Sequence, residues 1–505
     1  MASLRGLPGG VLRGAAGTLS LPRGPLLPGL PAAAGYAALL GFAVVMGVAA
    51  GYNPKYALAG AFALAFVAIV MVDVTLGLCA FTFLSFLELL LVTEDKSFSF
   101  LKVAGFLLMI SWLAHISTRR DRSESFVSEH PQFTFILLGF LTWAMVSASW
   151  AEVPGQAIDT ASRYFQNMIL FLIVYTAIRE RKHAVWVAWA WLLGATFATV
   201  PAMLNPPTYE DDLTVRISGT IGDPNELAAL LVAGVVFAGV LTAITRDRPP
   251  LRIAAGAAVG LFLMGIFYTV SRGGLLALGV ALIAACLLAG RWRGRALVVA
   301  GLGISVVVIY FASFAGLDAR DRVTTVQGGT GRSDLWKIGW RMFEDEPIRG
   351  IGSGNFPISS IHYLVQPGVI ERDDFIISTP KVAHNTYLQI LAELGIVGLA
   401  LFLTIIGFSI RCAFRAARRF GAHGDTQMEL VARGMIVALV GILTADFFIS
   451  EMYGKQLWLM LGLGPALYGV ARRTYPRPAP EPAAEPDPEP EPELAPILRP
   501  VPAGR

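Results

Sequence analysis

Long runs of apolar residues separated by short polar segments dominate this chain. A helix that crosses a membrane needs about 20 apolar residues, since each rises about 1.5 Å through a hydrocarbon core of about 30 Å. This criterion predicts about fourteen spans and an all-α polytopic membrane protein. The spans fall near residues 33–50, 55–72, 74–92, 101–117, 133–149, 165–178, 184–202, 225–245, 251–270, 274–290, 296–315, 387–410, 430–449 and 455–471.

The composition agrees with a membrane protein. Of the 505 residues, 55% are hydrophobic and 15% are charged, whereas a soluble domain carries about 25% charged residues. The net charge of +4 is small, and the basic residues are spread over many short loops, which argues against a nucleic-acid partner. The three cysteines lie in or beside apolar runs, so no disulfide framework is implied.

The basic residues predict the topology, because short loops rich in Lys and Arg remain in the cytoplasm. Each basic cluster follows an even-numbered span, so all clusters fall on one side and both termini are cytoplasmic. This alternation requires a turn at Asp73 between the second and third spans, because merging those spans would reverse everything downstream. The clusters are Arg119-Arg120-Arg122, Arg179-Arg181-Lys182, Arg246-Arg248-Arg252, Arg291-Arg293-Arg295, Arg411-Arg415-Arg418-Arg419 and Arg472-Arg473.

Five parts of the chain follow from this topology. The N-terminal part places arginines among Gly, Pro and Leu and is unlike a cleaved signal, and the C-terminal part alternates Pro with acidic residues and Ala, which cannot bury apolar surface. The parts are a disordered cytoplasmic extension (1–32), spans 1–11 (33–315), a long non-cytoplasmic loop with short helices (316–386), spans 12–14 (387–471) and a disordered cytoplasmic tail (472–505).

One helix is predicted inside the long loop. Ser333 is a candidate N-cap, and Trp336, Trp340 and Phe343 share one helical face before Pro347. Such an aromatic stripe suits a helix lying in the headgroup layer. The Gly-x-Gly-x-Gly that follows has no βαβ context, so it is only a very weak indication of a dinucleotide site.

His384 closes the long loop where it meets the next span. An imidazole there can act as a general base that removes a proton from a sugar hydroxyl. It can equally be an interfacial histidine that only hydrogen-bonds at a helix start. The competing base is His362, in the middle of the same loop.

Arg272 lies in a tight turn, next to Gly273 and Gly274, which permit close approach of backbone or ligand. Its guanidinium can hold a diphosphate in a bidentate manner and offset the charge of a leaving group. The simpler alternative is an arginine that marks the membrane edge.

Arg216 precedes the eighth predicted span. Asp223 is a candidate N-cap for that span, with Pro224 at the first helical position. A cation beside a helix N-terminus forms an anion site. The alternative is a structural arginine paired with acids of the segment 210–212.

These residues resemble the O-antigen ligase and O-antigen polymerase superfamily. The similarity covers about Thr214 to Leu403, with the motifs in the family's order, and the motifs in this order are together more specific than any one alone. The motifs are Arg216 with Asp223-Pro-Asn225, Ser271-Arg272-Gly273-Gly274, Gly331-Arg332-Ser-Asp-Leu-Trp336, Pro347-Ile-Arg-Gly350-Ile-Gly352, and His384-Asn385-Thr-Tyr-Leu388 with Glu393-Leu-Gly395.

The resemblance implies a GT-C-like glycosyltransferase of the bacterial inner membrane that uses an undecaprenyl-diphosphate-linked glycan at the periplasmic face. It implies that His384 activates the acceptor and that Arg216 and Arg272 bind the donor diphosphate. Supporting roles fall to Asn385, Asp223, Asn225, Arg332 and Trp336.

The resemblance also implies an inverting, metal-independent reaction without a cofactor. The acceptor is a sugar of the lipid A core in ligases, another repeat unit in polymerases and a protein hydroxyl in O-oligosaccharyltransferases. The fourteen predicted spans exceed the twelve typical of ligases, so twelve is possible and the sub-family stays open.

Two other classes of protein are alternatives. One is a polysaccharide or lipid transporter, which is disfavoured because charges gather at an outer loop instead of within spans. The other is a scaffold subunit.

Overall fold

The computed structural model describes residues 40–41, 43–45, 47–48, 50–51, 60, 66–88, 100–118, 125–206, 216–314, 316, 332–364 and 381–476. The chain divides into two compact units, Met1–Ala68 and Ile69–Arg505. The described residues of the first unit are helical, and the described regular structure of the second unit is helical throughout. The prediction of an all-α polytopic membrane protein is confirmed.

The helices of the second unit fall into three groups along the chain. The first comprises α3 (Val74–Leu84), α4 (Phe100–Thr118), α5 (Phe126–Glu129), α6 (Pro131–Val146), the 3-10 turn η2 (Ser147–Ser149), α7 (Pro154–Ala177) and α8 (Arg181–Leu204). The second comprises α9 (Pro224–Ile244), α10 (Pro249–Tyr268), α11 (Arg272–Leu288), η3 (Gly290–Trp292), α12 (Arg293–Ile309) and the π-helical η4 (Tyr310–Phe314). The third comprises α14 (Arg332–Asp345), α15 (Phe356–Leu364), α16 (Thr386–Ala422), α17 (Thr426–Ala445) and α18 (Lys455–Thr474).

From residue 74 onward, each predicted span coincides with a helix. Among the described residues, eight helices are long and apolar enough to cross a membrane, and α3 and α11 are shorter apolar helices. Helices α7 and α18, with 24 and 20 residues, also have the length that a membrane span needs. The two predicted spans before Asp73 lie largely outside the described residues, so the total of about fourteen stays a prediction.

The turn at Asp73 is present. Residues 69–72 are helical, and Asp73 caps α3 by accepting hydrogen bonds from two backbone N–H groups of its first turn. A Cβ added to Gly77 would lie 2.8 Å from the side chain of Val70. Residues seven positions apart in a continuous helix are separated by about 10 Å, so the chain folds back at Asp73.

Helix α3 is shorter than the predicted span at 74–92, because it ends at Leu84. The carbonyl of Ser85 accepts a hydrogen bond of 2.9 Å from Nε2 of Gln456, and the side chain of Phe86 is fully buried. Tertiary contacts therefore replace the next helical turn. The apolar pattern could not distinguish this buried loop from more helix.

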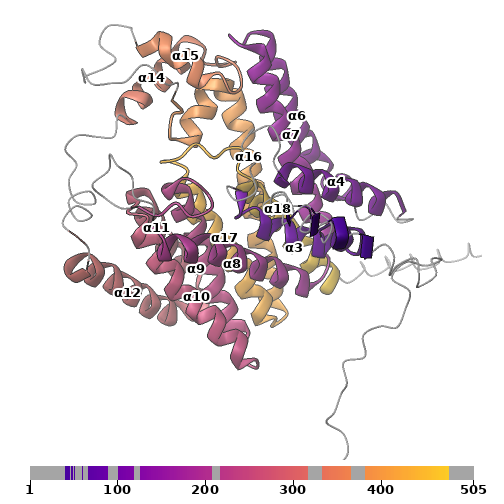
Figure 1. Cartoon of the computed structure of the whole chain (residues 1–505), viewed down its shortest axis with the longest axis vertical. Helices are drawn as coiled ribbons and strands as arrows, with labels where there is room; N and C mark the ends of the chain where they lie inside the picture. Colours follow the sequence, from indigo (N-terminus) through magenta and orange to yellow (C-terminus); the bar gives the residue numbers. More distant parts are fainter. Residues whose placement is uncertain are drawn as a thin grey trace, which may run out of the picture. The chain divides into compact units, whose positions relative to one another are not determined.

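The interior of the second unit is formed around α9, α16, α17 and α18. Helix α17 packs against α9, α11 and α16, and α16 also packs against α18. Trp458 on α18 and Trp191 on α8 are completely buried. Figure 1 shows α8, α9, α17 and α18 close together, with α12 at the edge of this group.

Basic residues that are far apart in the sequence meet at one end of the bundle, here called the basic end. Arg181 at the start of α8 lies 2.6 Å from Asp425, which caps α17. Arg291 lies 2.7 Å from Glu429 in the first turn of α17. Arg473 donates to backbone carbonyls just after α7. Their meeting is what the positive-inside assignment requires of these clusters.

The opposite end, here called the site end, holds the start of α16 and the two helices of the long loop. The N–H of Thr386 donates to the carbonyl of Asp446, the C-cap of α17, over 2.8 Å. A Cβ added to Gly339 on α14 would lie 3.0 Å from the side chain of Leu388 on α16. Figure 1 shows α14 and α15 beside the first part of α16.

The helix predicted inside the long loop is α14, but its cap is not Ser333. The helix already includes Arg332, so Ser333 lies within its first turn and the N-cap prediction is wrong. Leu335 and Met342 belong to the buried face, whereas Trp340 is 51% exposed. Trp336 and Phe343 of the aromatic stripe are half-buried, and contact of this stripe with the headgroup layer stays a prediction.

Helix α16 is divided at Gly395, where φ is 64°. The N–H of Ile396 donates to the carbonyl of Pro347 over 2.9 Å, and the indole of Trp143 donates to the carbonyl of Leu394 over 2.9 Å. These bonds replace helical bonds lost at the kink. The segment before Gly395 is therefore attached to the long loop, and the segment after it runs toward the basic end.

Candidate functional site

Arg216 is held against the end of α10 and the start of α9. Its Nε donates to the carbonyl of Thr269 over 2.9 Å, and its Nη2 donates to Oδ1 of Asn225 over 3.2 Å. The hydroxyl of Ser271 donates to the same Asn225 oxygen over 2.8 Å. The structure thus joins the Arg216 motif to the Ser271 motif through Asn225.

Asp223 caps α9, as the sequence predicts. Its Oδ1 accepts hydrogen bonds from the backbone N–H groups of Asn225 (2.7 Å) and Glu226 (3.0 Å), with Pro224 at the first helical position. An Asp cap satisfies backbone donors that would otherwise lack partners. The carboxylate of Asp223 is thereby fixed two residues from the side chain that binds Arg216.

Arg272 is the first residue of α11 and is exposed. Ser271 caps this helix by accepting the N–H of Gly274 over 3.1 Å. A Cβ added to Gly274 would lie 2.5 Å from that of Ala228 on α9, and one added to Gly273 would lie 3.0 Å from that of Phe448. The two glycines therefore serve close packing of protein against protein and keep Arg272 beside the Arg216 group.

His384 directly precedes the cap of α16. Asn385 accepts the N–H groups of Tyr387 (3.1 Å) and Leu388 (3.0 Å) and is the N-cap. The hydroxyl of Thr386 donates to the carbonyl of Ile449 over 2.9 Å. The backbone around His384 is therefore fixed on one side by α16 and on the other by the connection between α17 and α18.

Trp336 and Arg332 reach His384 from α14, one helical turn apart. The indole N–H of Trp336 donates to the carbonyl of Ala383 over 3.1 Å. Arg332 is close enough to act electrostatically on the imidazole of His384. The motif residues of the long loop thus gather around His384.

The electrostatic surroundings of His384 come from three separate parts of the chain. Burial lowers the pKa of its imidazole below the ordinary histidine value, and the positive charges of Arg332 and Lys381 lower this pKa further, while the negative charge of Asp223 raises it. The net direction is downward, so the neutral form dominates at neutral pH. A neutral imidazole is the form that accepts a proton.

The backbone is strained at two positions of this group. Among the described residues, Val270 (φ 47°) and His384 (φ 48°) are the two non-glycine residues with positive φ. Such conformations cost about 1–3 kcal/mol each and occur often at functional sites. Val270 directly precedes Ser271 and Arg272, so both strained residues adjoin predicted site motifs.

The glycine turn at residues 350–354 is a structural clamp on α16. The N–H of Gly354 donates to Oε2 of Glu393 over 2.7 Å, and the N–H of Gly352 donates to the carbonyl of the same residue over 2.9 Å. A Cβ added to Gly350 would lie 2.4 Å from the backbone of Glu393. Since protein fills the turn, the turn offers no room for a dinucleotide phosphate.

His362, the competing base, lies on α15 with a different set of partners. Its Nε2 is 2.8 Å from Oε1 of Glu152, in the connection before α7, and the hydroxyl of Ser359 donates to the other oxygen of Glu152 over 2.8 Å. These two hydrogen bonds lower the pKa of Glu152. The described contacts of His362 therefore attach α15 to the bundle.

The sequence analysis missed an acidic group next to Asp223. Burial raises the pKa of Glu451, and the charge of Asp223 raises it further. Glu451, Glu226 and Asp446 line one small cavity. Both carboxylate oxygens of the fully buried Asp446 lack a hydrogen-bond partner among the described residues. Asp446 lies inside the predicted span at 430–449, and an acidic residue within a span is the signal that could have drawn attention to it. Glu451 lies in the short connection that follows.

One further ion pair closes this side of the site. Nζ of Lys455, the first residue of α18, is 2.8 Å from both carboxylate oxygens of Glu88. The ion pair gives Glu88 a structural role at the start of α18. Both residues act electrostatically on Glu451.

The arrangement combines one half-buried base with several cations at a helix boundary. His384 can accept a proton, and Arg216, Arg272 and Arg332 can stabilise a negatively charged group. The helix N-terminus capped by Asp223 lies among them. Such a site is suited to chemistry in which a hydroxyl loses its proton while an anion departs.

Comparisons with known proteins relate this chain to one family and to two named relatives. Residues 257–403 match the sequence model of a family described as "O-Antigen ligase". The chain is 23% identical over 373 residues to the "Teichuronic acid biosynthesis protein TuaE" of Bacillus subtilis (strain 168), covering 68% of this chain and 73% of that protein. It is also 23% identical over 385 residues to the "Exopolysaccharide production protein ExoQ" of Rhizobium meliloti (strain 1021), covering 68% of this chain and 84% of that protein. The matched family segment contains Arg272, Arg332, Trp336 and His384.

Proposed function

For this integral membrane protein of the O-antigen ligase and polymerase superfamily, we propose transfer of a glycan from undecaprenyl diphosphate to an acceptor hydroxyl. The reaction takes place at the site end, on the periplasmic face of the bacterial inner membrane. The names of the two relatives refer to teichuronic acid and exopolysaccharide. Polysaccharide biosynthesis is therefore the proposed context of the reaction.

In the proposed reaction, His384 removes the proton of the acceptor hydroxyl. The acceptor oxygen attacks the anomeric carbon of the donor glycan and forms the new glycosidic bond, while the bond from that carbon to the diphosphate breaks. The diphosphate leaves with the bonding electron pair, and Arg216 and Arg272 stabilise its charge. Attack from the side opposite the leaving group inverts the anomeric centre. No metal or cofactor is part of this scheme.

One observation carries the proposal. His384 lies within the electrostatic influence of Asp223, while the neighbouring Asn225 binds Arg216 and Ser271. Residues separated by more than a hundred positions along the chain therefore surround one end of α9. A scaffold subunit would not require a base with a lowered pKa beside these cations.

The central test replaces His384 with Ala, with His362→Ala as the matched control from the same loop. A correctly placed base contributes about 10²- to 10⁴-fold to rate, so we expect His384→Ala to lower transfer by that factor. His362→Ala should retain most activity. The measurement is the release of undecaprenyl diphosphate from a labelled lipid-linked donor in proteoliposomes, with thermal unfolding as the check on folding.

The two variants also separate the alternatives. Equal activity of His384→Ala and the unmutated protein would reject the assigned base. Loss of activity only in His362→Ala would transfer the role to His362. A protein that moves labelled lipid-linked donor across the membrane without releasing undecaprenyl diphosphate would be a transporter.

The names of the relatives favour a second candidate function of the same chemistry, polymerisation of repeat units. In that reaction the acceptor hydroxyl belongs to another lipid-linked glycan instead of a lipid A core sugar or a protein. Purified protein supplied only with lipid-linked repeat units should then form longer lipid-linked chains. A product that requires lipid A core would instead identify a ligase.

A further inference from the structure

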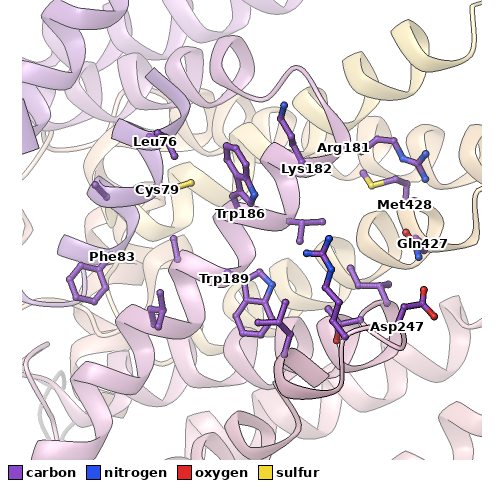
Figure 2. Close-up of a pocket in the computed structure, with 18 residues that line it drawn as sticks. Leu76, Cys79, Phe83, Arg181, Lys182, Trp186, Trp189, Asp247, Gln427 and Met428 are labelled. Atoms are coloured by element: carbon purple, nitrogen blue, oxygen red, sulfur yellow. The ribbon is translucent and has the colours of Figure 1, made fainter. Parts of the chain in front are cut away.

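A large pocket lies on the side of the bundle near the basic end, away from His384. Its volume is about 920 Å³, and it is bounded by α3, α8, the connection between α9 and α10, and the first turn of α17. Figure 2 shows Lys182, Trp186 and Trp189 along α8, with Cys79 and Phe83 on one side and Asp247, Gln427 and Met428 on the other.

One end of this pocket is cationic. Arg181, Lys182 and Arg248 line it together with a single acid, Asp247. Arg181 is oriented by its ion pair of 2.6 Å with Asp425. The lining itself carries three positive charges and one negative charge. Nζ of Lys182 also lies 2.8 Å from a carboxylate oxygen of Glu180, in an ion pair whose side chains are both more than half exposed. An exposed pair of this kind is weak, so a headgroup phosphate can take the place of Glu180.

The rest of the pocket wall is apolar and has the length of one lipid leaflet. Arg181 and Leu193 both line the pocket from α8, and the twelve residues between them correspond to about 18 Å along the helix axis. Half of a bilayer's hydrocarbon core is about 15 Å. Leu76 and Phe83 continue the apolar wall on α3.

Two tryptophans mark the transition between the charged and apolar parts. Trp186 and Trp189 line the pocket one and two turns beyond the cations of α8. Nζ of Lys182 lies 5.8 Å from the centre of the Trp186 ring. Tryptophan rings favour the headgroup level of a membrane. The pocket therefore presents a cationic end, then tryptophans, then an apolar wall, in the order in which a phospholipid presents its headgroup and its acyl chains.

We propose that this pocket binds an anionic phospholipid from the adjacent leaflet. The headgroup phosphate contacts Arg181, Lys182 and Arg248, and the acyl chains follow the apolar wall toward Phe83 and Leu193. The three cations of the lining favour an anionic over a zwitterionic headgroup, and the long apolar wall selects a lipid over a soluble anion. The bound lipid joins α3, α8, α10 and α17.

This site is independent of the glycan-transfer proposal. It lies near the basic end, whereas Asp223 and His384 lie at the site end. The undecaprenyl donor is therefore not its occupant, and the experiment below includes that lipid as a competitor.

The test measures binding of phosphatidylglycerol and phosphatidylcholine to the purified full-length protein by native mass spectrometry, and thermal unfolding in nanodiscs of either lipid. We expect tighter binding and a higher unfolding temperature with phosphatidylglycerol. Each basic residue near a membrane surface contributes about a fivefold change in affinity. The double variant Lys182→Gln with Arg248→Gln should therefore lose about 25-fold in affinity for phosphatidylglycerol.

Two further variants keep the test specific. Arg252→Gln removes an exposed charge of the same basic cluster that does not line the pocket, and it should keep most of the affinity. Leu193→Trp fills the apolar wall at a position that is 53% exposed, so folding should persist while lipid binding falls. This variant changes no charge.

Three results would overturn the proposal. They are equal binding of phosphatidylglycerol and phosphatidylcholine, an Arg252→Gln loss as large as that of the double variant, and displacement of phosphatidylglycerol by undecaprenyl diphosphate at equal mole fraction. The last result would assign the pocket to the donor lipid.

Discussion

The two ends of the bundle treat their charged residues differently. At the basic end, arginines face carboxylates: Glu429 lies 2.7 Å from Arg291 and 2.8 Å from Arg433. At the site end, the hydrogen bonds that orient Arg216 go to a backbone carbonyl and to the amide of Asn225. Ion pairs at the basic end join helix ends to one another. At the site end, one ion pair joins Lys455 to Glu88, and the hydrogen bonds of Arg216 set the direction of its side chain.

The two ends also differ in the strain they contain. The positive φ values of Val270 and His384 are at the site end, and so is the carboxylate of Asp446, which has no hydrogen-bond partner among the described residues. Strained backbone and unsatisfied buried groups are stabilised only by the structure around them and often have a functional reason. The comparison indicates that the basic end contributes to topology and stability and that the site end contributes to chemistry.

The largest expected effect concerns the kink that supports the site end. Replacing Gly395 with Ala would bring its Cβ to 2.2 Å from the carbonyl oxygen of Ile348, at a φ of 64°. We expect a loss of about 3 kcal/mol or more in the free energy of unfolding. Gly407→Ala, also on α16 and with nothing within 4 Å of an added Cβ, should be neutral or slightly stabilising. Thermal unfolding of both variants in detergent provides the comparison, and equal unfolding temperatures would contradict it.

The second effect concerns donor binding. In the proposed site, replacing Arg216 with Gln removes hydrogen bonds between its guanidinium and the donor diphosphate. A hydrogen bond to a charged group is worth about 1.5–3 kcal/mol, so KM for the lipid-linked donor should rise about 10- to 100-fold. Arg295→Gln, an exposed charge at the basic end, should leave KM unchanged. Steady-state kinetics at varied donor concentration measure both. Unchanged donor KM in Arg216→Gln would remove this arginine from the proposed diphosphate site.

The third effect belongs to the basic end alone. Glu429→Gln removes the carboxylate that Arg291 and Arg433 share. The side chain of Glu429 is 7% exposed, and those of Arg291 and Arg433 are 53% and 24% exposed. Because solvent screens both arginines in part, we expect a loss of about 1–2 kcal/mol of stability. Below the unfolding temperature, kcat and donor KM should not change. A large change in kcat at full folding would mean that the two ends are coupled.

The smallest effect is a pair of opposite shifts in pH dependence. Activity requires neutral His384, so it falls as pH decreases through the lowered pKa of this imidazole. Arg332→Gln removes a positive charge, which raises the pKa of His384 and moves the acid limb of kcat/KM to higher pH. Asp223→Asn removes a negative charge, keeps an N-cap side chain and moves the limb to lower pH. Shifts in the same direction would contradict the electrostatic assignment.

Local patterns predicted the features that depend on neighbouring residues. The apolar runs located the helices from residue 74 onward, and Asp223 was identified as a cap because its partners are two and three residues away. The predictions failed where distant residues decide. Residue spacing alone could not show that α3 ends at Leu84.

The candidate site divides in the same way. The motif residues His384, Arg216 and Arg272 were found from the sequence, because their residue types suit a base and an anion site. Their arrangement follows from contacts between distant segments, such as Trp336 with Ala383 and Asn225 with Ser271. Glu451 was missed because an acidic residue in a short connection gives no local sign that it is buried beside Asp223.

The sequence by itself determined that this protein is a bundle of apolar helices, where most of them lie, and which residues carry titratable or cationic groups at their ends. Helical periodicity and the cost of placing charge in lipid act locally, so they can be read from neighbouring residues. Only the tertiary structure decided that His384, Asp223 and Arg216 surround one helix end, and that a pocket with cations at one end lies at the other end of the bundle. Those placements depend on the packing of helices far apart in the chain, which no local pattern specifies.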